Sequence, residues 1–136
     1  MKQLVTTEWL EKNIDQVKVL DATWCLPNSN RNAEEEFNLH HIKNSIFFDI
    51  DKNSGQNTSL PHMLPSIQRW EEIVSNLGLK NSDRVIIYDN SDVYSSCRVG
   101  WAVNEVGQGA DGSGVVVGVL GRGVLAGGGG CGGCAK

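Results

Sequence analysis

The sequence predicts an α/β protein with a mainly parallel central sheet flanked by helices. Three short apolar segments, rich in β-branched and aromatic residues, have the composition of strands, at 17–22, 45–48 and 84–88. Helical patterns precede the first strand, at 6–14, and separate the others, at 32–41 and 66–78. Because strands alternate with helices, we expect right-handed helical crossovers that place the strands side by side and parallel.

The most regular helical pattern covers residues 66–78. Ser66 is a favourable N-cap, and Gly78 supplies the left-handed conformation that commonly follows a helix. Apolar residues recur between them at the spacing of one helix face, so this helix is expected to pack on the sheet. The side chains predicted to make this contact are Trp70, Ile73 and Leu77.

Glycine divides the chain into two compositional halves. Fourteen of its 16 glycines lie from Gly100 onward. We predict one domain over residues 1–126, whose last part (100–126) is degenerate but still offers a helix at 95–107 and a strand at 114–120. Residues 127–136 are predicted to form a disordered, glycine-rich tail, because polyglycine loses much backbone entropy on folding and buries no side chains.

Composition excludes several classes of function. The 136 residues carry a net charge of -4 and a pI near 5.3, with no basic stripe, so neither nucleic acid nor a membrane is an expected partner. No leader or long apolar segment is visible, and the four cysteines do not form a secreted disulfide framework, so a cytoplasmic location is predicted.

No metal or cofactor is predicted. The spacing of Cys131 and Cys134 provides only half of a zinc site. The glycines of residues 121–127 resemble a dinucleotide-binding loop, but no helical pattern follows them to direct its N-terminus at a pyrophosphate.

Three segments together resemble a known family: "LDATWCLPNSNRNAEEEFNLHHIKNSIFFDID", "LPHMLPS" and "VIIYDNSDVYSSCRV". They are similar, over about residues 4–99, to the first half of the thiosulfate and 3-mercaptopyruvate sulfurtransferases, which consist of two rhodanese domains. The resemblance implies a rhodanese-like fold and a persulfide relay. In that relay a cysteine of the second domain accepts sulfur from a small-molecule donor and passes it to a thiophilic acceptor such as a thiol. We expect this second domain to be absent from the chain, which would then be a truncated member of the family.

The resemblance also implies site residues. Asp51 and His62 match a carboxylate and an imidazole proposed to relay a proton in the 3-mercaptopyruvate-type members. His62 lies between Pro61 and Pro65, which restrict the backbone around it and favour a defined, non-helical loop. Asp89 occupies the position at which a catalytic rhodanese domain has its cysteine, so the chain alone is predicted to be inactive.

Other polar residues have plainer interpretations. Arg31, in the loop after the first predicted strand, is a candidate for substrate binding, although an exposed loop arginine is the default. His41 is expected to hold the loop before the second strand, and His40 to be exposed. Cys97 precedes an arginine that favours a thiolate, but its place within a helix predicts a small buried residue instead, and Cys25 is likewise expected to be packed.

Three functions remain open from the sequence. The chain is either the first domain of a sulfurtransferase that needs its second domain, or an independent inactive rhodanese domain that binds a partner or an anion. The third and weakest option is an independent thiol activity that uses Cys97 or the terminal cysteines.

Overall fold

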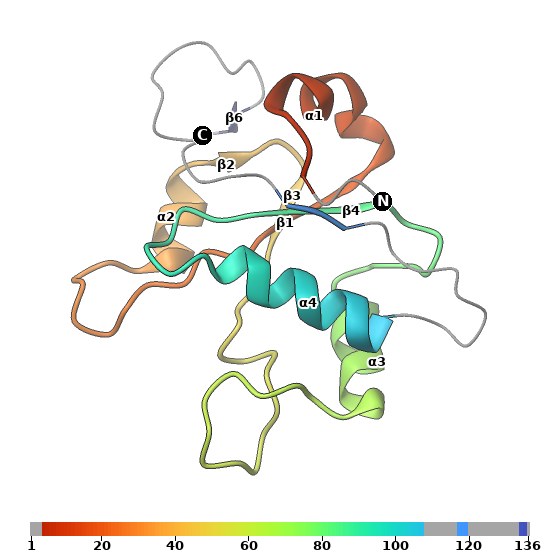
Figure 1. The fold of residues 1–136 in the computed structure, drawn as a ribbon. Coiled ribbons are helices and arrows are strands. Elements are labelled where there is room, and N and C mark those ends of the chain that lie inside the picture. The colour runs from red at the N-terminus through yellow and green to blue at the C-terminus, as the bar shows by residue number, and fades with distance from the viewer. Residues whose placement is uncertain (1–3, 108–116, 120–133, 136) are drawn as a thin grey trace.

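The computed structural model describes residues 4–107, 117–119 and 134–135 (Figure 1). Its helices are α1 (Thr7–Asn13), α2 (Ala33–Leu39), α3 (Ile67–Asn76) and α4 (Ser95–Gly107), with a short 3-10 helix at Ile14–Gln16. Its strands are β1 (Lys18–Asp21), β2 (His41–Ile42), β3 (Ser45–Phe47), β4 (Val85–Tyr88), β5 (Val117–Val119) and β6 (Cys134–Ala135).

Four strands form one parallel sheet in the order β3-β1-β4-β5. The three strands predicted from apolar patterns are β1, β3 and β4, and the predicted strand at 114–120 contains β5. The α/β class and the parallel sheet are therefore confirmed.

Each face of the sheet is covered by different helices. Side chains alternate along each strand, so neighbouring residues of one strand belong to different apolar clusters. On one face, Leu20 and Ile87 join a cluster that includes α3 and α4. On the other, Val19 and Ile86 pack with Leu10 of α1. Figure 1 shows this arrangement, with α1 on one side of the strands and α3 and α4 on the other.

The helix predicted at 66–78 is α3. The Ser66 side chain accepts a hydrogen bond from the backbone N–H of Arg69, and Gly78 adopts a φ of 70°. Trp70 and Ile73 are buried, and Leu77 packs at the edge of the same cluster. The predicted capping and the predicted packing face of this helix are both confirmed.

The C-terminal part departs from expectation at one point. Most of the predicted tail, residues 127–133 and 136, lies outside the described residues, but Cys134–Ala135 forms strand β6, antiparallel to β2. Backbone pairing needs no side chains, which allows it even in a glycine-rich sequence. None of the helices in the described part of the chain has the length and apolarity to cross a membrane.

Candidate functional site

Three loops meet at one edge of the sheet because β1, β3 and β4 are parallel and end together. They are residues 22–32, 48–66 and 89–94. In open parallel sheets, ligands bind outside this carboxyl edge. The predicted site residues Arg31, Asp51, His62 and Asp89 all lie on these loops.

The structure brings Asp51 and His62 together. The Nε2 atom of His62 lies 2.6 Å from the Oδ1 atom of Asp51, which is a direct hydrogen bond. The Asp51 side chain is 64% exposed and that of His62 is 22% exposed. The pair is therefore in contact and accessible to a ligand, as the predicted proton relay requires.

A third side chain completes this cluster. The indole Nε1–H of Trp24 donates a hydrogen bond to Oδ2 of Asp51 at 3.0 Å. The Trp24 and His62 rings also meet edge to face, with their centroids 5.0 Å apart. Both carboxylate oxygens of Asp51 are thus engaged, one by each ring.

The loop that carries His62 is closed by backbone contacts. The N–H of Gly55 donates to the carbonyl of Met63 at 2.6 Å, and a Cβ atom on Gly55 would lie 2.8 Å from the carbonyl oxygen of Leu64. His62 itself has a φ of 55°, which is uncommon for a residue other than glycine. The guanidinium of Arg98 on α4 donates to the His62 carbonyl and so braces this turn.

The loop after β4 is closed around its own first residue. Oδ1 of Asp89 accepts hydrogen bonds from the N–H of Ser91 at 2.9 Å and from its hydroxyl at 2.8 Å. Oδ2 accepts from the N–H of Ser96, in the first turn of α4, at 2.8 Å. Asp89 is 6% exposed, so its negative charge is buried against amide donors and the N-terminus of a helix.

A second buried carboxyl lies beside this loop, at the end of β1. Asp21 is 3% exposed, and its Oδ1 accepts from both the N–H and the hydroxyl of Thr23. Burial raises the pKa of Asp21; the Thr23 hydrogen bonds lower it and the charge of Asp89 raises it further. Burial also raises the pKa of the neighbouring Tyr88 hydroxyl.

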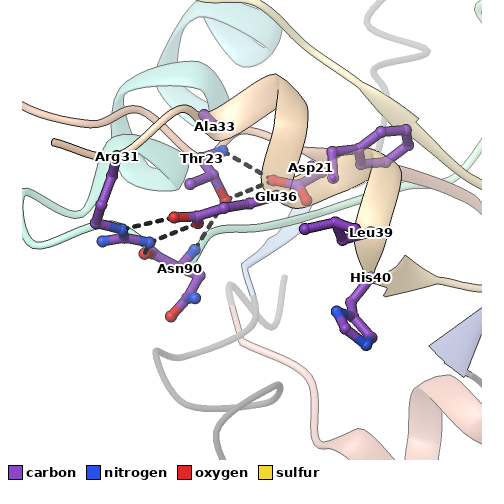
Figure 2. Close-up of a pocket in the computed structure, with 9 residues that line it drawn as sticks. Asp21, Thr23, Arg31, Ala33, Glu36, Leu39, His40 and Asn90 are labelled. Carbon is purple, nitrogen blue, oxygen red and sulfur yellow. Dashed lines mark hydrogen bonds and ion pairs between the residues drawn. The ribbon is translucent and has the colours of Figure 1, made fainter. Parts of the chain in front are cut away.

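Arg31 is committed to an internal ion pair. Its Nε and Nη2 atoms bind the two carboxylate oxygens of Glu36 at 2.8 and 2.7 Å, and Nη2 also donates to the carbonyl of Asn90 (Figure 2). These hydrogen bonds raise the pKa of Arg31 and lower that of Glu36. Arg31 lines a cavity of about 500 Å³ beside Asp21, but its guanidinium links the loop after β1 to the loop after β4.

The prediction that Cys97 is buried was wrong. Cys97 lies in α4 as expected, but it is exposed. Val99 and Val103, four residues apart, form the buried face of the helix, and Cys97 lies about 200° around the helix from Val99. Cys25 is partly buried, and this burial raises the pKa of its thiol.

Two histidines occupy the positions expected of them. His40 is exposed at the end of α2. His41 is partly buried, with Nδ1 2.8 Å from the carbonyl oxygen of Phe37 and its ring stacked on the Phe37 side chain. His41 therefore ties α2 to the segment that leads into β3.

Sequence reasoning missed Trp24, Gly55 and Arg98. Trp24 had a usable signal, since an aromatic residue directly after a strand at the carboxyl edge is close to any site there. Gly55 was one of only two glycines before Gly100, which also marks it. Arg98 had no such signal, because its contact with the His62 backbone depends on the packing of α4.

Comparison with known proteins identifies the family. The model of the rhodanese-like domain matches residues 6–120. The chain belongs to the rhodanese-like domain family. It is 40% identical over 100 residues to thiosulfate/3-mercaptopyruvate sulfurtransferase 1, mitochondrial, of Arabidopsis thaliana, covering 72% of this chain and 26% of that protein. It is 36% identical over 114 residues to the 3-mercaptopyruvate sulfurtransferase of Rattus norvegicus, covering 78% of this chain and 38% of that protein.

A solved structure supports the same assignment. This rhodanese-like chain superimposes on the 3-mercaptopyruvate sulfotransferase SseA of Escherichia coli with a TM-score of 0.76 and 29% identity, covering 91% of this chain and 46% of that one. The chain therefore spans less than half of that structure, and between about a quarter and two-fifths of the two sulfurtransferases named above. It is a rhodanese domain related to the 3-mercaptopyruvate sulfurtransferases.

Proposed function

We propose that this chain acts as the first, supporting rhodanese domain of a thiosulfate or 3-mercaptopyruvate sulfurtransferase. The observation that carries the proposal is the 2.6 Å contact between His62 Nε2 and Asp51 Oδ1 at the accessible carboxyl edge of the sheet. Asp89 occupies the position at which a catalytic rhodanese domain would have its cysteine, and a carboxylate cannot form a persulfide. His62 would therefore act as the proton donor, and a cysteine of a second domain would accept the sulfur.

The reaction balances with those two parts. A thiolate of the second domain attacks the sulfur of 3-mercaptopyruvate, an S–S bond forms, and the C–S bond breaks with its electron pair left on carbon. The resulting pyruvate enolate takes a proton at carbon from the imidazolium of His62, which gives pyruvate and a cysteine persulfide. An acceptor thiolate then attacks the outer sulfur and releases the cysteine thiolate. Asp51 orients the imidazole of His62 through the hydrogen bond at Nε2.

Exposed apolar side chains support a partner at this edge. Large apolar residues are exposed on each of the three loops that surround the site, and apolar side chains that gather on one surface are typical of a contact with another protein. They are Leu26, Leu60, Met63, Val93 and Tyr94. A second rhodanese domain placed against them would bring its thiolate toward His62.

An independent binding module is the second candidate. The closed loop at Asp89 favours it, because Ser91 and Ser96 already donate their N–H groups to an internal carboxylate. In that case the carboxyl edge would bind a partner without turnover. Thiol chemistry at Cys97 is the third candidate, favoured only by the exposure of this residue.

A complementation assay tests the proposal. The isolated chain should release no pyruvate from 3-mercaptopyruvate and form no thiocyanate from thiosulfate and cyanide. Addition of a separately produced catalytic rhodanese domain should raise pyruvate release above that of the catalytic domain alone. His62→Gln should then lower the release by about 100-fold, while His40→Gln should leave it unchanged.

Other results would favour the other candidates. Tight association without any gain in turnover would favour the binding module. Activity of the isolated chain that disappears in Cys97→Ser would favour independent thiol chemistry. A cytoplasmic location is also proposed, although one similar protein is named as mitochondrial, and fractionation of cells that produce the protein would decide between the two.

A further inference from the structure

We propose that Trp24 is a positioning residue for the Asp51–His62 pair. Its indole N–H fixes the rotation of the Asp51 carboxylate so that the other oxygen faces the imidazole. The inference rests on the proposed function for its catalytic consequence, but the positioning itself is a physical property of the isolated chain.

Asp51 needs an anchor because it is exposed. Its side chain is 64% accessible, and hydrogen bonds between exposed groups are weak when both partners are free to rotate. The backbone of Asp51 is held, since its N–H donates to Oδ1 of Asp49 at 3.0 Å. That contact leaves the rotation of the Asp51 carboxylate unrestricted, so the side chain depends on its own partners.

Trp24 has the rigidity that Asp51 lacks. It follows β1 and packs against the apolar cluster between the sheet and helices α3 and α4. From this position Nε1 reaches Oδ2 of Asp51 at 3.0 Å, while His62 takes Oδ1 at 2.6 Å. The indole N–H of Trp24, held by packing against the core, thus fixes the Asp51 carboxylate. That carboxylate in turn orients the imidazole of His62.

The indole ring restricts His62 as well. The two rings meet at an interplanar angle of 85° with centroids 5.0 Å apart, an edge-to-face contact that disfavours rotation of the imidazole. Arg98 holds only the carbonyl of His62. Trp24 therefore touches both side chains of the pair.

The decisive variant is Trp24→Phe, which keeps an aromatic ring and removes the N–H donor. The ring-nitrogen shifts of His62, measured by NMR on the isolated chain and assigned with His62→Gln, report the contact with Asp51. Asp51→Ala provides the shift of a His62 ring that has lost this contact. Trp24→Phe should move the Nε2 shift at least half of the way to that reference, whereas Trp9→Phe, a partly buried tryptophan on the opposite face of the sheet, should leave it unchanged.

A second measurement does not depend on the folding of a tryptophan variant. Asp51→Ala should move the indole N–H signal of Trp24 toward lower frequency, because the hydrogen bond to Oδ2 is lost. The signals of Trp9, Trp70 and Trp101 should stay in place. A Trp24 signal that does not respond to Asp51→Ala, or a His62 shift equal in Trp24→Phe and the unaltered chain, would overturn the proposal.

Pyruvate release in the complementation assay distinguishes the positioning role of Trp24 from the proposed function of the chain. With the catalytic domain added, Trp24→Phe should lower pyruvate release about tenfold, through kcat rather than KM, because the proton donor is misplaced. NMR changes as expected without any turnover in the unaltered pair would reject the proposed function and keep the positioning role. Full turnover in Trp24→Phe would reject the positioning role and keep the proposed function.

Discussion

The loops after β3 and β4 leave the same edge of the sheet but are built in opposite ways. The loop after β4 encloses Asp89, which is 6% exposed and accepts three hydrogen bonds from Ser91 and Ser96. The loop after β3 carries Asp51, which is 64% exposed and forms hydrogen bonds with the side chains of Trp24 and His62. The Asp89 carboxylate is thus buried among hydrogen-bond donors, while the Asp51 carboxylate is exposed to solvent.

Because of this difference, we expect Asp89 to contribute mainly to the stability of the fold and Asp51 mainly to function. A buried carboxylate with amide partners leaves unpaired donors when it is removed, so its loss should destabilise the fold. An exposed pair is solvated when it is broken, so its loss should alter chemistry and leave the fold nearly intact. Substitutions in these loops and at the end of β1 should affect stability to different extents, the largest at Asp89 and the smallest at Asp51.

Asp89→Ala should lower the free energy of unfolding by about 3 kcal/mol. Two backbone N–H groups and one hydroxyl would lose their acceptor in a buried environment, and α4 would lose the negative charge at its N-terminus. Urea unfolding followed by circular dichroism measures the change. Glu71→Ala, which removes an exposed carboxylate from α3, is the control and should cost less than about 0.5 kcal/mol.

Gly55→Ala should cost about 1–2 kcal/mol, because the added Cβ would lie 2.8 Å from the carbonyl oxygen of Leu64. The backbone must shift, so the His62 ring-nitrogen shifts should change as well. Gln56→Ala, the next residue in the same loop, should change neither quantity appreciably. An unaltered His62 spectrum in Gly55→Ala would mean that this loop tolerates the shift without moving the pair.

Asp21→Asn should change how stability depends on pH. Burial raises the pKa of Asp21 in the folded protein, so the folded state favours the protonated form. The contribution of Asp21 is complete below its unfolded pKa and is lost as the pH rises through the folded value. Relative to Asp21→Asn, the unaltered protein should therefore lose stability in thermal unfolding as the pH rises above about 4, the ordinary pKa of an aspartate; a difference that does not change with pH would contradict the raised pKa.

Asp51→Asn should lower the free energy of unfolding by less than about 1 kcal/mol. The side chain is mostly exposed, and the amide oxygen of asparagine still accepts a hydrogen bond from Trp24. Urea unfolding should show this small change alongside a large loss of pyruvate release in the complementation assay. A loss of stability as great as that of Asp89→Ala would remove the contrast between the two loops.

Local patterns in the sequence were sufficient to predict the sheet and the helices. The strands β1, β3 and β4 and the caps of α3 depend on residues within a few positions of one another, so composition and periodicity predict them directly. The pairing of Asp51 with His62 was predicted from family resemblance and from two flanking prolines. Spacing alone does not imply it.

The remaining features depend on contacts between distant parts of the chain, which only the tertiary structure decides. Trp24 lies 27 positions from Asp51, and Arg98 lies 36 positions from His62, so neither contact follows from a local pattern. Cys97 was expected to be buried because of its place within a helix, yet α4 turns Val99 and Val103 to the sheet and Cys97 to solvent. Apart from the pairing of β2 with β6, the sequence alone determined which segments form strands and helices, while packing determined which side chains those elements bring together.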